Sequence, residues 1–122
     1  MRVLVVDDTK SVRERLAAMI AAIAGVERVT QEADGLAGLA AIAMEAPDVV
    51  VLDIRMPRVN GFQLLAELHG RAESPTCIVV SNHAEYTRHA LLAGASYFFD
   101  KSTELDALLA TIGSLAAQRR AW

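Results

Sequence analysis

The stretch Val49-Val50-Val51-Leu52-Asp53 is a short apolar run that ends in a carboxylate. Three of its four apolar residues are β-branched, and none alternates with a polar residue. This pattern is typical of a strand that is buried on both faces, as in a parallel sheet covered by helices. Three other runs share the pattern, at residues 3–6, 77–80 and 97–99, and a more polar run at residues 26–32 suits an edge strand.

Helical patterns separate the expected strands. The first is an apolar stripe at helical spacing, formed by Val12, Leu16, Met19, Ile20 and Ile23. A capping box of Ser11 and Glu14 is expected at its start, and Gly25 is expected to cap its end. Further helices are expected at about residues 34–45, 61–69, 85–93 and 104–118. Five strand–helix repeats predict an α/β fold, a five-stranded parallel sheet that is doubly wound as (βα)5.

Length and composition limit the classes of protein to consider. The 122 residues predict one domain over residues 1–122, with no output domain in this chain. No apolar stretch reaches the roughly 18 residues of a membrane span, so no membrane contact is expected. The single cysteine, Cys77, cannot form an internal disulfide and favours a reducing, cytoplasmic compartment, where we expect it as a buried, inert thiol.

The charge balance points to a local acidic site. The net charge is −3, from 15 acidic and 12 basic side chains. Without Asp7, Asp8 and Asp53, the sequence has 12 acidic and 12 basic side chains. This balanced remainder lacks the basic surface of a nucleic-acid-binding protein, so no direct contact with nucleic acid is expected.

Polar side chains follow four of the expected strands. Asp7 and Asp8 follow the first strand, Asp53 the third and Ser81 the fourth, while Lys101 lies just beyond the fifth. In doubly wound sheets, ligands bind beyond the carboxyl ends of the strands. The topology therefore predicts that these five side chains meet at one edge of the sheet.

Such a group of carboxylates predicts a bound cation. Two carboxylates roughly 4 Å apart repel each other by about 4 kcal/mol at an effective dielectric constant near 20. Three carboxylates offset only by Lys101 carry a charge of about −2, which one Mg²⁺ would neutralise, and Mg²⁺ prefers oxygen ligands. Histidines and cysteines at zinc-binding spacing are absent from the sequence.

With the cation bound, one carboxylate is free to attack phosphorus. Aspartate forms covalent phosphoryl intermediates, and phosphoryl transfer needs mainly positioning and neutralisation of the phosphoryl oxygens. Lys101 and the Ser81 hydroxyl are the expected contacts to those oxygens. No general base is required.

These motifs together resemble the receiver domains of two-component response regulators, in particular the single-domain chemotaxis type. The matching residues are Val3-Leu4-Val5-Val6-Asp7-Asp8, Ala33-Asp34-Gly35, Pro47 to Asp53, Met56-Pro57 with Gly61, Ser81, Gly94-Ala95 and Phe99-Asp100-Lys101. The resemblance implies the flavodoxin-like strand order 2-1-3-4-5. It also implies a signalling switch that catalyses only its own phosphorylation and dephosphorylation.

The resemblance assigns the metal site residue by residue. Asp53 is the expected phosphoacceptor. Asp8, the Asp53 carboxylate and the backbone carbonyl of Arg55 are the expected direct ligands of Mg²⁺, and Asp7 is expected to act through a water. Lys101 and Ser81 are the expected contacts to the phosphoryl group.

The resemblance also implies partners and a readout. The expected donor is a histidine kinase or a histidine phosphotransfer protein. Ser81 and the aromatic Phe98 are the expected switch residues. The face of the fourth helix, fifth strand and fifth helix is the expected surface for a downstream protein, and a phosphorylation-dependent homodimer is a further expectation.

Three departures from the family pattern concern the surroundings of the site. Asn82 stands where a small residue is usual, and with His83 and Arg55 it is expected to modulate the site by narrowing access, so we predict slow loss of the phosphate. Ser102 replaces the proline that often follows the lysine, which removes the reason to expect a cis peptide there. Phe98 lacks the hydroxyl of the commoner tyrosine.

Two other functions stay open from the residues alone. One is a small Mg²⁺-dependent phosphohydrolase that uses Asp53 as its nucleophile, although the expected loops are too short to form a substrate cap. The other is an interaction module without phosphorylation. For Asp8 alone, or Thr9, a simple helix-capping role is the plainer interpretation.

Overall fold

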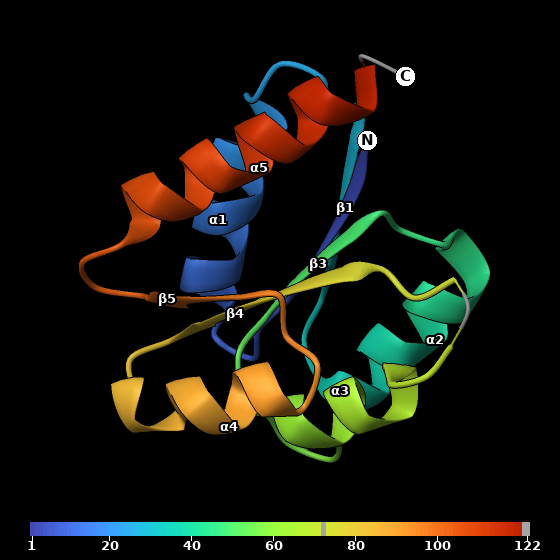
Figure 1. Ribbon diagram of the computed structural model, residues 1–122, viewed down its shortest axis with the longest axis vertical. Coiled ribbons are helices and arrows are strands. Elements are labelled where there is room, and N and C mark those ends of the chain that lie inside the picture. The colour runs from blue at the N-terminus through green and yellow to red at the C-terminus, as the bar shows by residue number, and fades with distance from the viewer. Residues whose placement is uncertain (72, 121–122) are drawn as a thin grey trace.

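The computed structural model describes residues 1–71 and 73–120, in which strands and helices alternate along the chain (Figure 1). The strands are β1 (Arg2–Val6), β2 (Arg28–Glu32), β3 (Val49–Leu52), β4 (Thr76–Ser81) and β5 (Tyr97–Asp100). The α-helices are α1 (Lys10–Ala21), α2 (Gly35–Glu45), α3 (Gly61–Leu68), α4 (Thr87–Leu92) and α5 (Leu105–Arg120), and a 3-10 turn, η1 (Ala84–Tyr86), precedes α4.

The five strands form one parallel sheet in the order β2-β1-β3-β4-β5. This confirms the predicted doubly wound α/β fold, its flavodoxin-like strand order and the edge position of β2. The register aligns the carboxyl ends of β1 and β3, since Val6 pairs with Leu52. Asp7 and Asp53 are therefore each the first residue beyond aligned strand ends.

Helices cover both faces of the sheet, with α1 and α5 on one side and α2, α3 and α4 on the other (Figure 1). Along β1, Val3 and Val5 pack on the side of α1 and α5, whereas Leu4 and Val6 pack on the side of α2 and α3. Both sets are buried. This two-sided burial is why the strands show no alternation of apolar and polar residues.

The apolar face of α5 packs in the core, and the predicted burial of Cys77 is confirmed. Leu108 and Ile112 of α5 are fully buried, and Leu105, Leu109 and Leu115 pack against the same cluster. Cys77 is buried and free, and burial raises the pKa of its thiol to about 11. A thiol with so high a pKa is almost entirely protonated at neutral pH, so it is a poor nucleophile.

The predicted ends of the first helix are wrong. Thr9 is the N-cap residue, Ser11 lies inside the helix, and Glu14 pairs at 3.9 Å with Lys10 instead. The helix begins early because Asp7 Oδ1 accepts a hydrogen bond from the Thr9 amide directly after β1, which turns the chain at that point. The helix also ends at Ala21, and Gly25, with φ of 92°, belongs to the following turn.

Other boundaries differ less. The fourth predicted helix is divided into η1 and α4, and α3 starts with a capping box that the prediction lacked, in which Asn60 and Gln63 each bond the other's main chain. The peptide bond between Lys101 and Ser102 is trans. No helix within the described residues combines the length and hydropathy needed to cross a membrane.

Candidate functional site

Asp7 is held rigidly at the end of β1. Its side chain is almost fully buried, and its amide donates a hydrogen bond of 3.1 Å to the main-chain oxygen of Glu32. Its Oδ1 accepts from the Thr9 amide at 2.9 Å, and its Oδ2 accepts from Lys101 Nζ at 2.8 Å. A buried carboxylate needs such donors, since an unpaired buried charge is strongly destabilising.

Asp53 lies beside it and shares the same lysine. Its amide bonds the main-chain oxygen of Val6 at 3.2 Å, which places the two strand ends side by side. Its Oδ1 accepts from the Ile54 amide at 2.7 Å, and its Oδ2 accepts from Lys101 Nζ at 2.9 Å. The ammonium of Lys101 therefore bridges two carboxylates from β1 and β3.

The pKa of Lys101 is raised despite its partial burial. Burial lowers this pKa, but the hydrogen bonds to Asp7 and Asp53 and the negative charges of both carboxylates together outweigh burial. The charged ammonium is thus retained at neutral pH. Lys101 reaches the site because its amide bonds the main-chain oxygen of Ser81 at 3.1 Å, just beyond the paired ends of β4 and β5.

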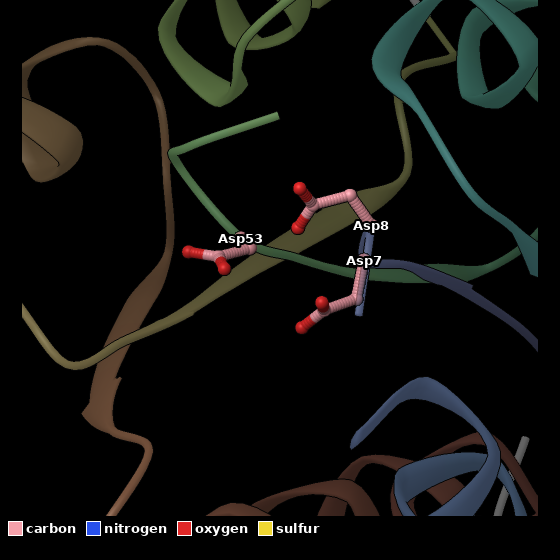
Figure 2. A group of neighbouring side chains, drawn as sticks. All are labelled: Asp7, Asp8 and Asp53. Atoms are coloured by element: carbon pink, nitrogen blue, oxygen red, sulfur yellow. The ribbon is translucent and has the colours of Figure 1, made fainter. Parts of the chain in front are cut away.

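Asp8 completes an acidic cluster. It is exposed, and carboxylate oxygens of Asp7, Asp8 and Asp53 lie within 4.8 Å of one another (Figure 2). The three carboxylates and the Lys101 ammonium, which pairs with Asp7 and Asp53, together carry a charge of about −2. Oxygen donors alone, gathered at a partly open position, suit a hard divalent cation such as Mg²⁺.

Ser81 lies near this cluster without joining it. It is fully buried, and its hydroxyl accepts a hydrogen bond of 3.1 Å from the His83 amide. Within the described chain, the Ser81 hydroxyl makes no hydrogen bond to Asp53 or to the Lys101 side chain. The structure therefore brings together four of the five side chains predicted to meet.

The remaining predicted residues lie on β5 and just after β4. Phe98 is partly buried against the core on the side of α2 to α4. Asn82 is exposed, and its Oδ1 accepts from the Ser102 hydroxyl at 2.8 Å. His83 Nδ1 lies 3.4 Å from Glu85 Oε1.

A group of aromatic side chains beside the cluster was missed by the sequence reasoning. Arg55 Nη2 donates to the Tyr86 hydroxyl at 3.3 Å, and this bond raises the pKa of Arg55. The Phe62 ring meets Tyr86 edge-on at 5.6 Å and stacks on His89 at 4.1 Å. No local motif links residues this far apart, so only the folded topology reveals the group.

This group borders an open groove next to the acidic cluster. The groove has a volume of about 650 Å³, and its lining includes Asp8, Arg55, Met56, Phe62 and Tyr86. A small phosphorylated molecule or a phosphorylated side chain could therefore approach Asp8 and its neighbours from this side.

Comparison with known families identifies the arrangement. Residues 3–113 match the response regulator receiver domain. The chain belongs to this family. Receiver domains are phosphoryl-accepting signalling switches, and this chain carries an acidic cluster at its strand ends.

Relatives of the receiver domain are spread over several kinds of protein. The chain is 40% identical over 98 residues to a protein-glutamate methylesterase/protein-glutamine glutaminase of Anaeromyxobacter dehalogenans, covering 78% of this chain and 27% of that protein. It is 30% identical to the transcriptional regulatory protein DegU of Brevibacillus brevis, covering 95% of this chain and 50% of that protein. The chain thus spans at most half the length of these curated relatives.

Solved structures agree with the fold over nearly the whole chain. The receiver domain of Francisella response regulator 1452 superposes with a TM-score of 0.85 at 26% identity, covering 97% of this chain and 98% of that one. The response regulator domain of Thermotoga maritima CheB gives a TM-score of 0.78 at 29% identity, covering 97% and 94%.

Proposed function

We propose that Asp53 is the phosphoacceptor of this receiver domain and that Asp7, Asp8 and Lys101 form the site around it. The observation that carries the proposal is the Lys101 ammonium, which lies 2.8 Å from Asp7 and 2.9 Å from Asp53. It places a fixed positive charge where a phosphoryl oxygen on Asp53 would need one. Its raised pKa supports a charged ammonium throughout the physiological range.

Mg²⁺ is the proposed cofactor. Asp8, Asp53 and the backbone carbonyl of Arg55 would bind it directly, and Asp7 through a water. The donor set fits, since the three carboxylates share one small region and the exposed Asp8 keeps a side open to solvent. A bound Mg²⁺ would offset the negative charge that the carboxylates and the phosphoryl group bring together.

In the proposed transfer, an Asp53 oxygen attacks the phosphorus of a phosphohistidine on a histidine kinase or phosphotransfer protein. The new O–P bond forms as the N–P bond of the donor breaks, and the imidazole leaves with the electron pair and takes up a proton. Lys101 then contacts a phosphoryl oxygen. Ile54, whose amide bonds Asp53 Oδ1 at 2.7 Å, keeps the carboxylate oriented during the attack.

The switch uses Ser81 and Phe98. We propose that the Ser81 hydroxyl exchanges its bond from the His83 amide for one to the phosphoryl group, and that Phe98 follows this movement. The changed surface of α4, β5 and α5 then binds a downstream protein. A cytoplasmic setting belongs to the same proposal, supported by the free, buried thiol of Cys77.

Intact-mass measurement with acetyl phosphate and Mg²⁺ tests the acceptor. We expect the wild-type chain to gain one phosphoryl group and Asp53→Ala to gain none. Asp106→Ala, which removes an exposed carboxylate in the first turn of α5, is the matched control and should be phosphorylated normally. A mass gain retained in Asp53→Ala would refute the assignment.

No observation favours the two alternative functions. A phosphohydrolase would release phosphate from an ester over many turnovers, and an interaction module would show the same Mg²⁺ affinity in the wild type and in Asp8→Ala. Both measurements can be made on the same preparations.

A further inference from the structure

Arg13 lies beside the acidic cluster but has no part in the transfer described above. It belongs to the first turn of α1, and its Nη1 donates a hydrogen bond of 2.9 Å to the main-chain oxygen of Asp7. The Arg13 guanidinium of α1 thus contacts the main chain just after β1. Its positive charge lies next to a cluster that Lys101 alone does not neutralise.

Packing does not account for an arginine at this position. The Nε atom of Arg13 is buried, and among the described residues it has no hydrogen-bond partner. An unpaired buried donor destabilises the folded state. A methionine would fill a similar space without that penalty, so the gain from arginine lies in its bond to Asp7 and in its charge.

The bond to Asp7 restrains the peptide unit that leads to Asp8. Because the peptide unit is planar, holding the Asp7 oxygen also holds the nitrogen and the Cα atom of Asp8. The Asp7 carboxylate is fixed separately, by the Thr9 amide and Lys101. The exposed Asp8 carboxylate makes no hydrogen bond with the residues that the structure describes. The orientation of its backbone therefore limits the positions that the Asp8 carboxylate can reach beside Asp53.

We infer that Arg13 is a positioning residue of the cation site, which orients Asp8 for binding Mg²⁺ through the main chain of Asp7. This inference rests on the proposed function. Two effects of Arg13 oppose each other. Its charge repels a cation, whereas its hydrogen bond preorganises a ligand, and loss of outer partners of metal ligands typically weakens metal binding about 10- to 100-fold. The inference is that positioning outweighs repulsion.

The two effects change Mg²⁺ affinity in opposite directions, so one variant distinguishes them. The variant is Arg13→Met, and the measurement is the dissociation constant for Mg²⁺ from backbone amide NMR shifts during a MgCl₂ titration, with no phosphodonor present. If positioning dominates, this constant rises about tenfold while the rest of the amide spectrum stays native. If only the charge matters, its removal makes Mg²⁺ bind more tightly.

The matched control is Arg15→Met, two residues further along α1, where the arginine is exposed. It removes the same charge without touching Asp7, and we expect an unchanged or slightly lower dissociation constant. Should Arg13→Met fail to fold, Arg13→Lys replaces it. This variant keeps the charge but has a shorter side chain without the guanidinium fork, and weaker Mg²⁺ binding is again expected.

Mg²⁺ binding by the wild type and by Asp8→Ala distinguishes failure of the proposed function from failure of the role of Arg13. If the wild type binds no Mg²⁺, the proposed function fails and the role of Arg13 fails with it. If the wild type binds Mg²⁺ and Asp8→Ala does not, the proposed site stands. An Arg13 variant that then binds as tightly as the wild type, or more tightly, overturns the positioning role alone.

Discussion

Lys101 contributes to both the stability and the proposed chemistry of the site. Its ammonium pairs with two carboxylates that the ends of β1 and β3 bring together, and one of them, Asp7, is almost fully buried. The same ammonium is the proposed contact for a phosphoryl oxygen. Phosphorylation of Asp53 would therefore exchange an ion pair within the protein for one with the new group.

We predict that Lys101→Met lowers the free energy of unfolding by about 1–3 kcal/mol at neutral pH, because it leaves Asp7 buried without its cation. The pKa of Lys101 is raised in the folded state, so its contribution is complete below its ordinary pKa of about 10.4 and is lost as the pH rises through the higher folded value. Denaturant unfolding of both proteins from neutral to strongly alkaline pH measures this difference.

Lys10→Met is the control, since Lys10 is exposed and its salt bridge to Glu14, at 3.9 Å, lies on the surface. It should cost less than about 1 kcal/mol. A difference between wild type and Lys101→Met that already disappears below about pH 10 would contradict the raised pKa of Lys101.

Some residues of the site could be predicted from the strand topology, and others could not. Asp7, Asp8, Asp53 and Lys101 follow apolar runs, so parallel topology alone implies that they meet, and their cluster confirms it. The hydroxyl of Ser81 has the expected strand-end position but bonds the His83 amide, because a strand-end position does not determine a rotamer. Arg13 gives no such signal, since its contact to Asp7 depends on where α1 begins.

At the scale of elements, the segment after β3 is tied to the start of α4. Arg55 follows Asp53 by two residues, and its side chain bonds Tyr86 of η1. Phe62 of α3 contacts both Tyr86 and His89 of α4. Arg55 and Tyr86 together border the groove beside Asp8, so their hydrogen bond joins two elements of its lining.

From this we predict slow loss of the phosphate, with a half-life longer than seconds, because Arg55 and Tyr86 narrow the path of an attacking water. Tyr86→Phe removes the acceptor for Arg55 and should shorten the half-life several-fold. The measurement is the decay of phosphorylated protein on Phos-tag gels after the donor is removed. Thr87→Val is the control: it removes a neighbouring hydroxyl, which donates to the main-chain oxygen of Ala84, and should leave the half-life unchanged. A half-life of seconds in the wild type would contradict this prediction.

The start signals of helices illustrate why element boundaries were harder to predict than the elements. Asn60 and Gln63 form a real capping box, whereas Ser11 and Glu14, at the same spacing, do not. A loop precedes Asn60 and lets the motif set the boundary. Asp7 directly follows β1, and its carboxylate accepts a hydrogen bond from the Thr9 amide, so the helix has already begun when the chain reaches Ser11.

For the whole molecule, the alternation of strands and helices predicted more of the structure than local sequence motifs did. Strand order, the burial of both sheet faces and the edge that carries the site all follow from five apolar runs separated by helices. The exposed side chains that a partner would contact are harder to predict, because they do not have to pack against the rest of the protein. On α4 and β5, these include Leu92 at 74% exposure, Leu91 at 44% and Tyr97 at 36%.

These apolar side chains on the face of α4, β5 and α5 lead to the last prediction, a phosphorylation-dependent homodimer. Phosphorylated protein should show a higher mass than unphosphorylated protein in size-exclusion chromatography with light scattering. Leu92→Glu places a charge in the apolar surface and should weaken self-association about tenfold or more, which corresponds to about 1.4 kcal/mol. It should leave the rate of phosphorylation unchanged, since Leu92 lies outside the acidic cluster.

Met44→Glu is the control, because Met44 is an apolar residue of α2 that is 87% exposed. If both variants weaken self-association equally, or if phosphorylation leaves the mass unchanged, α4 and β5 are not the dimer surface.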